Sequence, residues 1–468
     1  MRCTARALGA VLAGSLGTAS CAGLASSGAG LHGFTASQAV PDAGGSHYIS
    51  HVVVVIQENR SFDDFFATFP GADGATQGRM KTPSGSILVN LHRVPLAEPC
   101  DFSHSYGDYV HDYDGGAMDG FNLEYGGPNC LGQSGAAPYQ YVDPSQIAPY
   151  WDIAQQYVLA DHMFTTQGSG SFTGHQALIA GGTTINPEKT KTLVDYPSAM
   201  PWGCDAPPKT VTSMLVAEST IHGPVLKYRY RGGPFPCLGY RTMRDLLDAK
   251  GISWKYYSPP EPVGTGAFWN AFDAIEAVRR GPQWSTNIAS PTTFFIDVDE
   301  RTLPAVSWIV PTQPDSDHPG KHAVAGPSWV ASIVNAIGES TYWQNTAVIV
   351  VWDDWGGFYD HVPPPFFDRW GGLGFRVPML VVSPYALRGS GVHGGYVSHT
   401  QYEFGSILKF IEHVWSLGSL HKTDERATSI IDCFDFSQAP RKFNAIPSKY
   451  SKEYFLHQPP SNEPVDTE

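Results

Sequence analysis

The chain has 468 residues, of which 42% are hydrophobic, 12% aromatic and 16% charged, and these proportions exclude a disordered or fibrous protein. This length suits one large α/β domain with insertions. The formal net charge of −14 argues against nucleic acid or an anionic membrane as a tight electrostatic partner, because both require basic surfaces. An anionic substrate must therefore be attracted by local positive charge.

The N-terminus predicts an export signal. Arg2 and Arg6 precede a mostly apolar stretch and then small residues, so we interpret residues 1–25 as a signal peptide and the Gly-, Ser- and Ala-rich residues 26–46 as a flexible leader. Cys21 lies where a lipoprotein cysteine would, so a lipid anchor is the alternative to a free secreted or periplasmic protein. No later apolar run approaches the about 20 residues that cross a bilayer.

Short apolar runs predict the strands of a sheet. His51–Ile56 is a continuous run dominated by β-branched residues, which is typical of a central parallel strand. Further runs occur at 252–257, 346–352 and 377–383, and helical patterns at 242–250, 268–280, 328–337 and 401–417. This alternation predicts an α/β fold with a doubly wound, mainly parallel sheet flanked by helices.

The catalytic domain is expected to span residues 47–440. Its Pro- and Gly-rich segment 187–236 predicts an insertion or cap, and residues 441–468 a polar tail that wraps the surface or frays. An exported protein with five mature cysteines should form two disulfides and leave one thiol. Proximity in the sequence favours the pairs Cys100–Cys130 and Cys204–Cys237, with Cys433 left over.

The end of the first predicted strand carries polar side chains where ligands of open α/β sheets collect. Glu58 and Asn59 offer two neighbouring oxygen ligands, and Arg60 offers a guanidinium that can bind phosphate. A helix start capped by Ser61 would explain the same residues, so this segment alone leaves both interpretations open.

Two adjacent carboxylates, Asp353 and Asp354, follow the run at 346–352. Carboxylates that leave a buried strand together repel each other and lose hydration, and a cation relieves both costs. A solvated turn is the alternative. Gly356 and Gly357 would let the backbone pass close to a ligand or to the preceding loop.

A Gly- and Ser-rich loop at 165–175 precedes a helix predicted at 176–180. A serine near a helix N-terminus, such as Ser171, meets backbone donors and the positive end of the helix dipole, which suit an alkoxide and a phosphate. The Gly-x-Ser-x-Gly order of a lipase is missing because Thr173 stands two residues after Ser171. The lysine of a P-loop is missing as well.

Several blocks together carry a specific resemblance. They are residues 51–71, 168–182, 317–319, 352–365 and 376–384, followed by Ser398-His399-Thr400 and residues 432–436. In this order they resemble the signature blocks of the phosphoesterase family, which joins bacterial phospholipases C and acid phosphatases. The resemblance implies an alkaline-phosphatase-like fold, in agreement with the alternation of strands and helices.

Carried over position by position, the resemblance makes Glu58, Asn59, Asp353 and Asp354 ligands of one divalent metal ion. It makes Ser171 the nucleophile, which itself touches the metal. Ligands that are all oxygen favour a hard ion, Ca²⁺ or Mg²⁺, over zinc.

The resemblance also implies roles for polar residues around the phosphoryl group. His104 and His318 match histidines that flank it, and His361 matches a third histidine of the motifs. We expect Arg60 and Asp317 to bind the substrate. In the expected mechanism, Ser171 attacks phosphorus in line, a protonated His318 or His104 donates to the leaving oxygen, and water hydrolyses the phosphoserine.

The substrate of this predicted hydrolase is open between two kinds of phosphate ester. Ser171 and the Asp353-Asp354 pair lean toward the acid phosphatase branch, because many phospholipases C carry Thr and Asp-Glu there. The adjacent histidines of that branch have no counterpart, so a non-specific phospholipase C that releases diacylglycerol is the alternative. A remoter one is a non-catalytic calcium-binding surface protein, suggested by Asp112-Tyr-Asp114-Gly-Gly, although the EF-hand pattern is missing.

Overall fold

A computed structural model describes residues 48–97, 99–124, 126, 130, 135–220, 223–259, 270–320, 323–365, 372–391 and 393–459. The predicted signal peptide, the leader and Cys21 lie outside the described residues. Within them, no helix combines the length and the apolar character that crossing a membrane requires.

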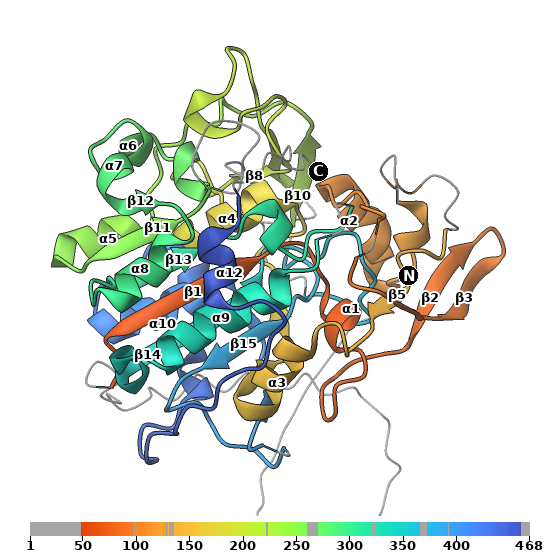
Figure 1. Ribbon diagram of the computed structural model, residues 1–468. Helices are drawn as coiled ribbons and strands as arrows, with labels where there is room; N and C mark the ends of the chain where they lie inside the picture. The colour runs from red at the N-terminus through yellow and green to blue at the C-terminus, as the bar shows by residue number, and fades with distance from the viewer. Residues whose placement is uncertain are drawn as a thin grey trace, which may run out of the picture. The chain divides into compact units, whose positions relative to one another are not determined.

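One eight-stranded sheet forms the centre of the fold, with the strand order β12-β11-β13-β1-β14-β15-β6-β16 (Figure 1). In that order the bounds are Ile288–Ala289, Trp254–Tyr257, Val306–Ile309, His51–Gln57, Thr346–Trp352, Met379–Val382, Val158–Ala160 and Tyr396–Ser398. Among these strands β15 alone runs antiparallel to its neighbours, which confirms the mainly parallel α/β sheet. The β-branched run of β1 lies at its buried centre, as predicted.

Helices flank this sheet in two groups whose members contact one another (Figure 1). The first group is α3 (Ala148–Gln156), α8 (Thr293–Asp299), α9 (Gly326–Gly338) and α12 (Lys452–His457). The second is α4 (Ser171–Ala180), α5 (Met243–Lys250), α10 (Phe404–Trp415) and α11 (Thr423–Arg426). The predicted helices at 242–250, 328–337 and 401–417 correspond to α5, α9 and α10.

The prediction of a single helix over 268–280 is wrong for residues 270–280, which the structure describes. The chain forms a 3₁₀ turn at Ala271–Ala274 and a short helix α6 at Glu276–Arg279, separated by the extended residue Ile275. Leu238 N donates to Ala274 O at 2.7 Å and Glu276 N donates to Leu238 O at 3.0 Å. This pairing with a distant residue replaces the hydrogen bonds that a continuous helix would need.

The predicted insertion contains a separate antiparallel sheet of β8 (Lys191–Val194), β9 (Ser213–Thr220) and β10 (Gly223–Arg229). It lies at the top of Figure 1. The predicted disulfide Cys204–Cys237 joins the insertion to the chain that follows it, and the predicted pair Cys100–Cys130 is confirmed too. Cys433 is a buried free thiol.

The remaining elements are short. They are α1 (Phe62–Phe66), β2 (Gln77–Thr82), β3 (Gly85–Asn90), β4 (His92–Val94), α2 (Tyr106–Tyr113), β5 (Gln140–Val142), β7 (Met163–Phe164), α7 (Gln283–Asn287) and β17 (Tyr402–Glu403). The described part of the C-terminal tail wraps the surface. Its Phe455 is buried against Trp329 of α9, with 5.1 Å between the ring centroids.

Candidate active site

The candidate site lies where two neighbouring parallel strands end. Gln57 of β1 pairs with Trp352 of β14, and Asp353 N donates to Gln57 O at 3.1 Å. Glu58-Asn59 and Asp353-Asp354 therefore leave the sheet side by side, as the carboxyl-end rule predicts. Asn59 has a left-handed backbone (φ 49°), an unusual conformation for a residue other than glycine and one that concentrates at functional sites.

Ser171 is the first residue of α4, with Gly170 as N-cap. The helix thus begins five residues earlier than the sequence predicted. The Ser171 hydroxyl donates to Asp354 Oδ2 at 3.1 Å and accepts from Asn59 Nδ2 at 3.1 Å. Asn59 Nδ2 also lies 3.0 Å from His104 Nε2, so the structure brings these four predicted residues into one buried network.

Four buried oxygens at the site accept no hydrogen bond within the described protein: Glu58 Oε2, Asn59 Oδ1 and both carboxylate oxygens of Asp353. Burial raises the pKa of Glu58 and that of Asp353 well above their usual values, and the charge of Asp354 raises both further. Buried oxygens without donors are costly unless a cation is present. The residues therefore fit a metal ion, which the sequence predicted for this place.

His175 is a site residue that the sequence reasoning missed. Its Nε2 donates to Glu58 Oε1 at 2.8 Å and lies 3.6 Å from Asp353 Oδ2, and these three residues form a group that could hold a metal ion. Tyr256 OH lies 3.5 Å from His175 Nδ1. The missed signal is spacing, because His175 is four residues after Ser171 and so faces the same side of α4.

We expect replacement of His175 by Ala to lower the affinity for a divalent metal by about 10- to 100-fold, because a hydrogen-bonded partner orients a ligating carboxylate. His175→Gln should retain more affinity, since its amide can still donate to Glu58. Calorimetric metal titration measures both. His51→Gln, at the start of β1 and so at the end of that strand away from Glu58, is the matched control. Equal affinities in all three variants would contradict the role of His175.

Two glycines allow the close packing of this network. A Cβ on Gly174 would lie 2.6 Å from Asp353 O, so only glycine lets α4 approach the loop that carries Asp353 this closely. Gly356 has φ +60°, and its Cβ would lie 2.5 Å from Asn59 O. The expectation that a glycine of this pair lets the backbone approach the preceding loop is confirmed.

The structure places His318 and Asp317 in a neighbouring loop after β13. A Cβ on Gly320 would lie 2.9 Å from Asp101 Cβ, so this loop packs against the segment that carries His104. His318 is buried and its Nδ1 lies 2.8 Å from Pro319 O. Asp317 is also buried, and its Oδ2 accepts a hydrogen bond from Tyr150 OH at 2.7 Å. This contact lies inside the protein and gives no support to the predicted substrate role of Asp317.

Arg60 is fully buried and its guanidinium bonds within the protein. Nη1 pairs with Asp64 at 3.0 Å, Nε donates to Asp317 O at 2.9 Å, and Nη2 donates to Leu96 O at 3.3 Å. These contacts hold loops together and do not turn the guanidinium toward the site. The predicted substrate role of Arg60 therefore receives no support from its position.

His361 lies in a second charged cluster with Asp63, Asp360 and Arg376. Its Nδ1 lies 2.7 Å from Asp63 Oδ2, while Arg376 pairs with Asp360 at 2.9 Å. Burial alone would lower the pKa of His361, but the hydrogen bond and charge of Asp63 outweigh it and raise the pKa to about 9. The hydrogen-bond partners of His361 that the structure describes therefore belong to this second cluster and not to the Ser171 network.

The raised pKa of His361 predicts a pH-dependent stability. Protonated His361 stabilises the fold fully below its unfolded pKa of 6.5, and this contribution disappears as pH rises through about 9. His361→Gln should therefore flatten the loss of unfolding free energy between these pH values. Urea unfolding of both proteins at several pH values measures it, and parallel pH profiles would refute the assignment.

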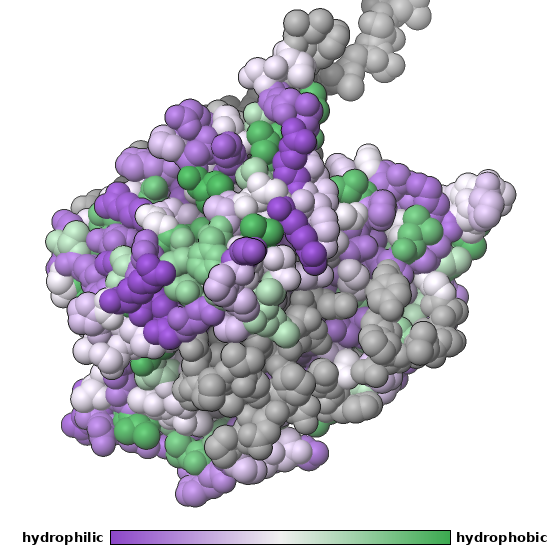
Figure 2. All heavy atoms as spheres, turned by 90° about the horizontal axis from the view of Figure 1, so that it is seen from above, coloured by the Kyte–Doolittle hydropathy of each residue, from purple (hydrophilic) through white to green (hydrophobic). Residues whose placement is uncertain are grey.

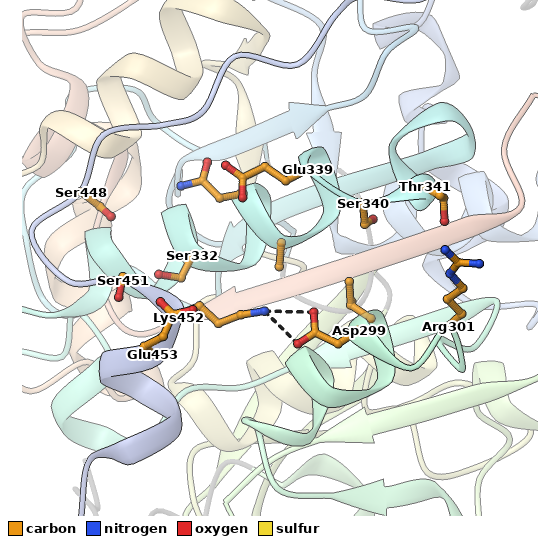
Figure 3. Close-up of a pocket in the computed structure, with 13 residues that line it drawn as sticks. Asp299, Arg301, Ser332, Glu339, Ser340, Thr341, Ser448, Ser451, Lys452 and Glu453 are labelled. Carbon is orange, nitrogen blue, oxygen red and sulfur yellow. Dashed lines mark hydrogen bonds and ion pairs between the residues drawn. The ribbon is translucent and has the colours of Figure 1, made fainter.

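A cavity of about 610 Å³ lies elsewhere, beside α8, α9 and α12 (Figure 3). Its lining includes Asp299, whose carboxylate oxygens each lie 2.9 Å from Lys452 Nζ, together with Arg301, Glu339 and several hydroxyl groups. None of the residues predicted for the site lines this cavity. Asp299 pairs with Lys452 and the other charged side chains of the lining are exposed, so the described lining of the cavity holds no cluster of buried carboxylates like that of the candidate site.

Known proteins resemble this chain over most of its length. A model of the Phosphoesterase family matches residues 49–418. Phospholipase C B of Mycobacterium tuberculosis (strain ATCC 25618 / H37Rv) is 28% identical over 461 residues, which covers 85% of this chain and 82% of that protein. Non-specific phospholipase C1 of Arabidopsis thaliana is 24% identical over 431 residues, which covers 84% and 72%.

Among solved structures, a protein in the alkaline phosphatase superfamily from Vibrio parahaemolyticus is similar with a TM-score of 0.38 and 10% identity. The match covers 82% of this chain and 72% of that one. The family assignment comes from the sequence match, which spans both strand ends of the site and the start of α4. The chain therefore belongs to the Phosphoesterase family and is a hydrolase of phosphoric esters.

Proposed function

We propose that this protein is a phospholipase C that cleaves a phospholipid into diacylglycerol and a phosphorylated head group. The observation that carries the proposal is the position of the Ser171 hydroxyl, which begins a helix and lies beside Asp354 and Asn59. Relatives named phospholipase C, which match 85% and 84% of this chain, support this substrate class.

Charge near the site favours a phosphodiester over a phosphomonoester. A monoester is largely a dianion at neutral pH and requires more positive charge than a monoanionic diester. Arg60, the guanidinium closest in sequence to the metal ligands, is neutralised by Asp64 and buried. Among the described residues of the site, the remaining positive charge would be that of a bound metal ion and of any histidine that is protonated.

The proposed metal ligands are Glu58, Asn59, Asp353, Asp354 and Ser171. A divalent ion bound there supplies a Lewis acid that lowers the pKa of the serine hydroxyl and neutralises phosphoryl oxygens. The mainly oxygen donor set favours Ca²⁺ or Mg²⁺. Two disulfides fit the proposed location outside the cytoplasm.

The chain's own residues divide the remaining work. Asp354 Oδ2 accepts the Ser171 hydrogen bond and takes the proton as Oγ forms its bond to phosphorus. The first N–H groups of α4 and the helix dipole stabilise the phosphoryl oxygens. His104 or His318, protonated, donates to the diacylglycerol oxygen as its bond to phosphorus breaks. Water then cleaves the phosphoserine, which releases the phosphorylated head group and restores the Ser171 hydroxyl.

Hydrolysis of two soluble chromogenic esters tests this proposal. p-Nitrophenylphosphorylcholine is a diester and p-nitrophenyl phosphate a monoester, and each is assayed with metal and with chelator. We expect faster cleavage of the diester, which chelator abolishes. Preference for the monoester would instead establish an acid phosphatase, which the Asp353-Asp354 pair and Ser171 favour. Absence of cleavage of either ester with every metal would refute the proposed substrate class.

A further inference from the structure

Two chains of aromatic rings lead from residues beside the catalytic groups to the surface of the insertion. The first begins at Phe172, directly after Ser171. The ring of Phe172 lies 5.7 Å from that of Trp202, and Trp202 stacks on Tyr196 with 6.1 Å between ring centroids. Phe172 and Trp202 are buried, whereas Tyr196 is 37% exposed.

The second chain of rings begins at Tyr106, two residues after His104. Tyr106 contacts Tyr228 of β10 with 5.4 Å between ring centroids, and Tyr228 lies 6.3 Å from Tyr230. Tyr230 is 64% exposed, which is high for a large aromatic side chain. Tyr230 follows the end of β10, and its ring contact with Tyr228 places both rings on the same side of the hairpin.

Asp195, which precedes Tyr196, connects the two chains of aromatic rings to the loop that carries Ser171. Tyr228 OH donates to Asp195 Oδ2 at 2.6 Å, and Tyr106 N donates to Asp195 Oδ1 at 2.6 Å. Asp195 N donates to Ser169 Oγ at 2.7 Å. The exposed tyrosines therefore hold a fixed position relative to the loop that carries the nucleophile.

Positive charge accompanies these tyrosines. Lys227 and Arg229 both pair with Glu218, at 2.5 and 3.4 Å, and the Arg231 guanidinium lies 5.1 Å from the ring centre of Tyr230. Lys227 and Arg229 alternate with Tyr228 along β10 and lie with Glu218 on the other face of the hairpin, so Arg231 supplies the positive charge beside Tyr230. We call this surface the tyrosine rim and define it by Tyr196, Tyr228, Tyr230 and Arg231.

The composition of the rim matches the head-group region of a phospholipid bilayer. A tyrosine ring has an apolar body and a polar tip and is enriched at membrane interfaces, and arginine binds phosphate through its guanidinium. On the face seen from above, hydrophobic residues form small patches among hydrophilic ones (Figure 2). The tyrosines and the arginine of the rim suit shallow contact with head groups.

We propose that the tyrosine rim is a docking surface for a phospholipid bilayer that carries anionic head groups, placed beside the active site. This inference rests on the proposed phospholipase function. The rim would hold the loop that carries Ser171 near the lipid surface, so that a head group reaches the loop while its acyl chains stay out of water. The remote negative charges do not prevent docking, because salt screens them beyond about 8 Å at physiological ionic strength.

Vesicle sedimentation of the full chain tests the docking surface. The probe is vesicles of phosphatidylcholine that contain phosphatidylglycerol. We expect Arg231→Ala to weaken partitioning about fivefold, since one basic residue near an anionic surface contributes about 1 kcal/mol. The double variant Tyr230→Ala with Arg231→Ala should lose about tenfold or more, and Arg231→Glu should lose more than Arg231→Ala.

The matched control removes an exposed tyrosine and an arginine away from the rim. Tyr454 on α12 is 44% exposed, and Arg301 lines the cavity of Figure 3. The variant Tyr454→Ala with Arg301→Ala should bind vesicles as the unaltered protein does. All proteins should cleave soluble p-nitrophenylphosphorylcholine equally, which also shows that they are folded.

The outcomes separate this inference from the proposed function. Loss of vesicle binding and of vesicle hydrolysis in the rim variants, with soluble diester cleavage unchanged, supports the docking surface. Vesicle binding by the rim variants equal to that of the unaltered protein overturns it, as does failure of the unaltered protein to bind vesicles. Failure to cleave the soluble diester at all refutes the proposed function instead.

Discussion

Ser171→Ala should lower kcat for a phosphate ester by at least about ten-thousand-fold, because the hydroxyl is the only proposed group that forms a bond to phosphorus. The substitution removes one oxygen that lies 3.1 Å from Asp354 and 3.1 Å from Asn59. Glu58 and Asp353 remain, so the variant should still bind a divalent metal. The measurement is steady-state hydrolysis of the preferred chromogenic ester.

A matched variant distinguishes loss of the nucleophile from damage to the fold. Ser332→Ala removes another buried serine hydroxyl. Ser332 lies on α9, and its hydroxyl donates to Tyr450 O at 3.4 Å. Its kcat should stay within about twofold of the unaltered protein, as is usual away from a functional site. If Ser171→Ala retained a tenth of the activity, a different residue or a water molecule would have to attack phosphorus.

The strand ends of the site could be predicted from the sequence because their physical signals are strong. The run His51–Ile56 and the run at 346–352 are too apolar and too β-branched to lie elsewhere than in a buried sheet. Polar residues directly after such strands must leave the sheet at one edge. The order of the strands, with β15 reversed between β14 and β6, depends on long-range packing that no local pattern reports.

The omission of His175 has a specific cause. Thr173 and Gly174 are poor helix formers, so the sequence suggested a helix that begins at 176. In the structure α4 begins at Ser171, since Gly174 lets the helix pack against the Asp353 backbone. Tertiary packing therefore overrides local propensity, and a histidine four residues after the nucleophile enters the site.

The predicted substrate role of Arg60 receives no support, because its guanidinium is used inside the protein. Asp64 is four residues after Arg60, and the two side chains pair across the start of α1, which begins at Phe62. Burial of this pair cannot be read from the sequence, because it depends on the carbonyl groups of Leu96 and Asp317 that the fold brings near. A guanidinium next to metal ligands is therefore not sufficient evidence of phosphate binding.

Asp353→Asn should raise the stability of the metal-free protein and weaken metal binding, and these two opposite effects test the metal site directly. Burial, then the charges of Glu58 and Asp354, raises the pKa of Asp353 well above its usual value. A carboxyl whose pKa is raised in the folded state costs stability increasingly as pH rises above its unfolded pKa of 3.8. Without metal, Asp353→Asn should therefore raise the free energy of unfolding at neutral pH, by about 1 to 3 kcal/mol.

With metal, the same substitution should have the reverse effect. A ligand that binds only the folded state stabilises it in proportion to the logarithm of its concentration over Kd. Loss of the Asp353 charge should weaken metal binding at least about 100-fold, so the added stability should largely disappear. Thermal unfolding in chelator and in a series of Ca²⁺ and Mg²⁺ concentrations measures both effects.

Asp360→Asn is the matched control, because Asp360 is equally buried but already has a cationic partner. Its carboxylate lies 2.9 Å from Arg376 Nε and 3.0 Å from Nη2. Removing this charge leaves a buried guanidinium without its main partner, so the metal-free protein should lose about 3 to 5 kcal/mol. If Asp353→Asn stabilises the metal-free protein and Asp360→Asn destabilises it, the Asp353 carboxylate is placed for a cation that the protein itself does not supply. If both substitutions destabilise the metal-free protein, the metal site at Asp353 is refuted.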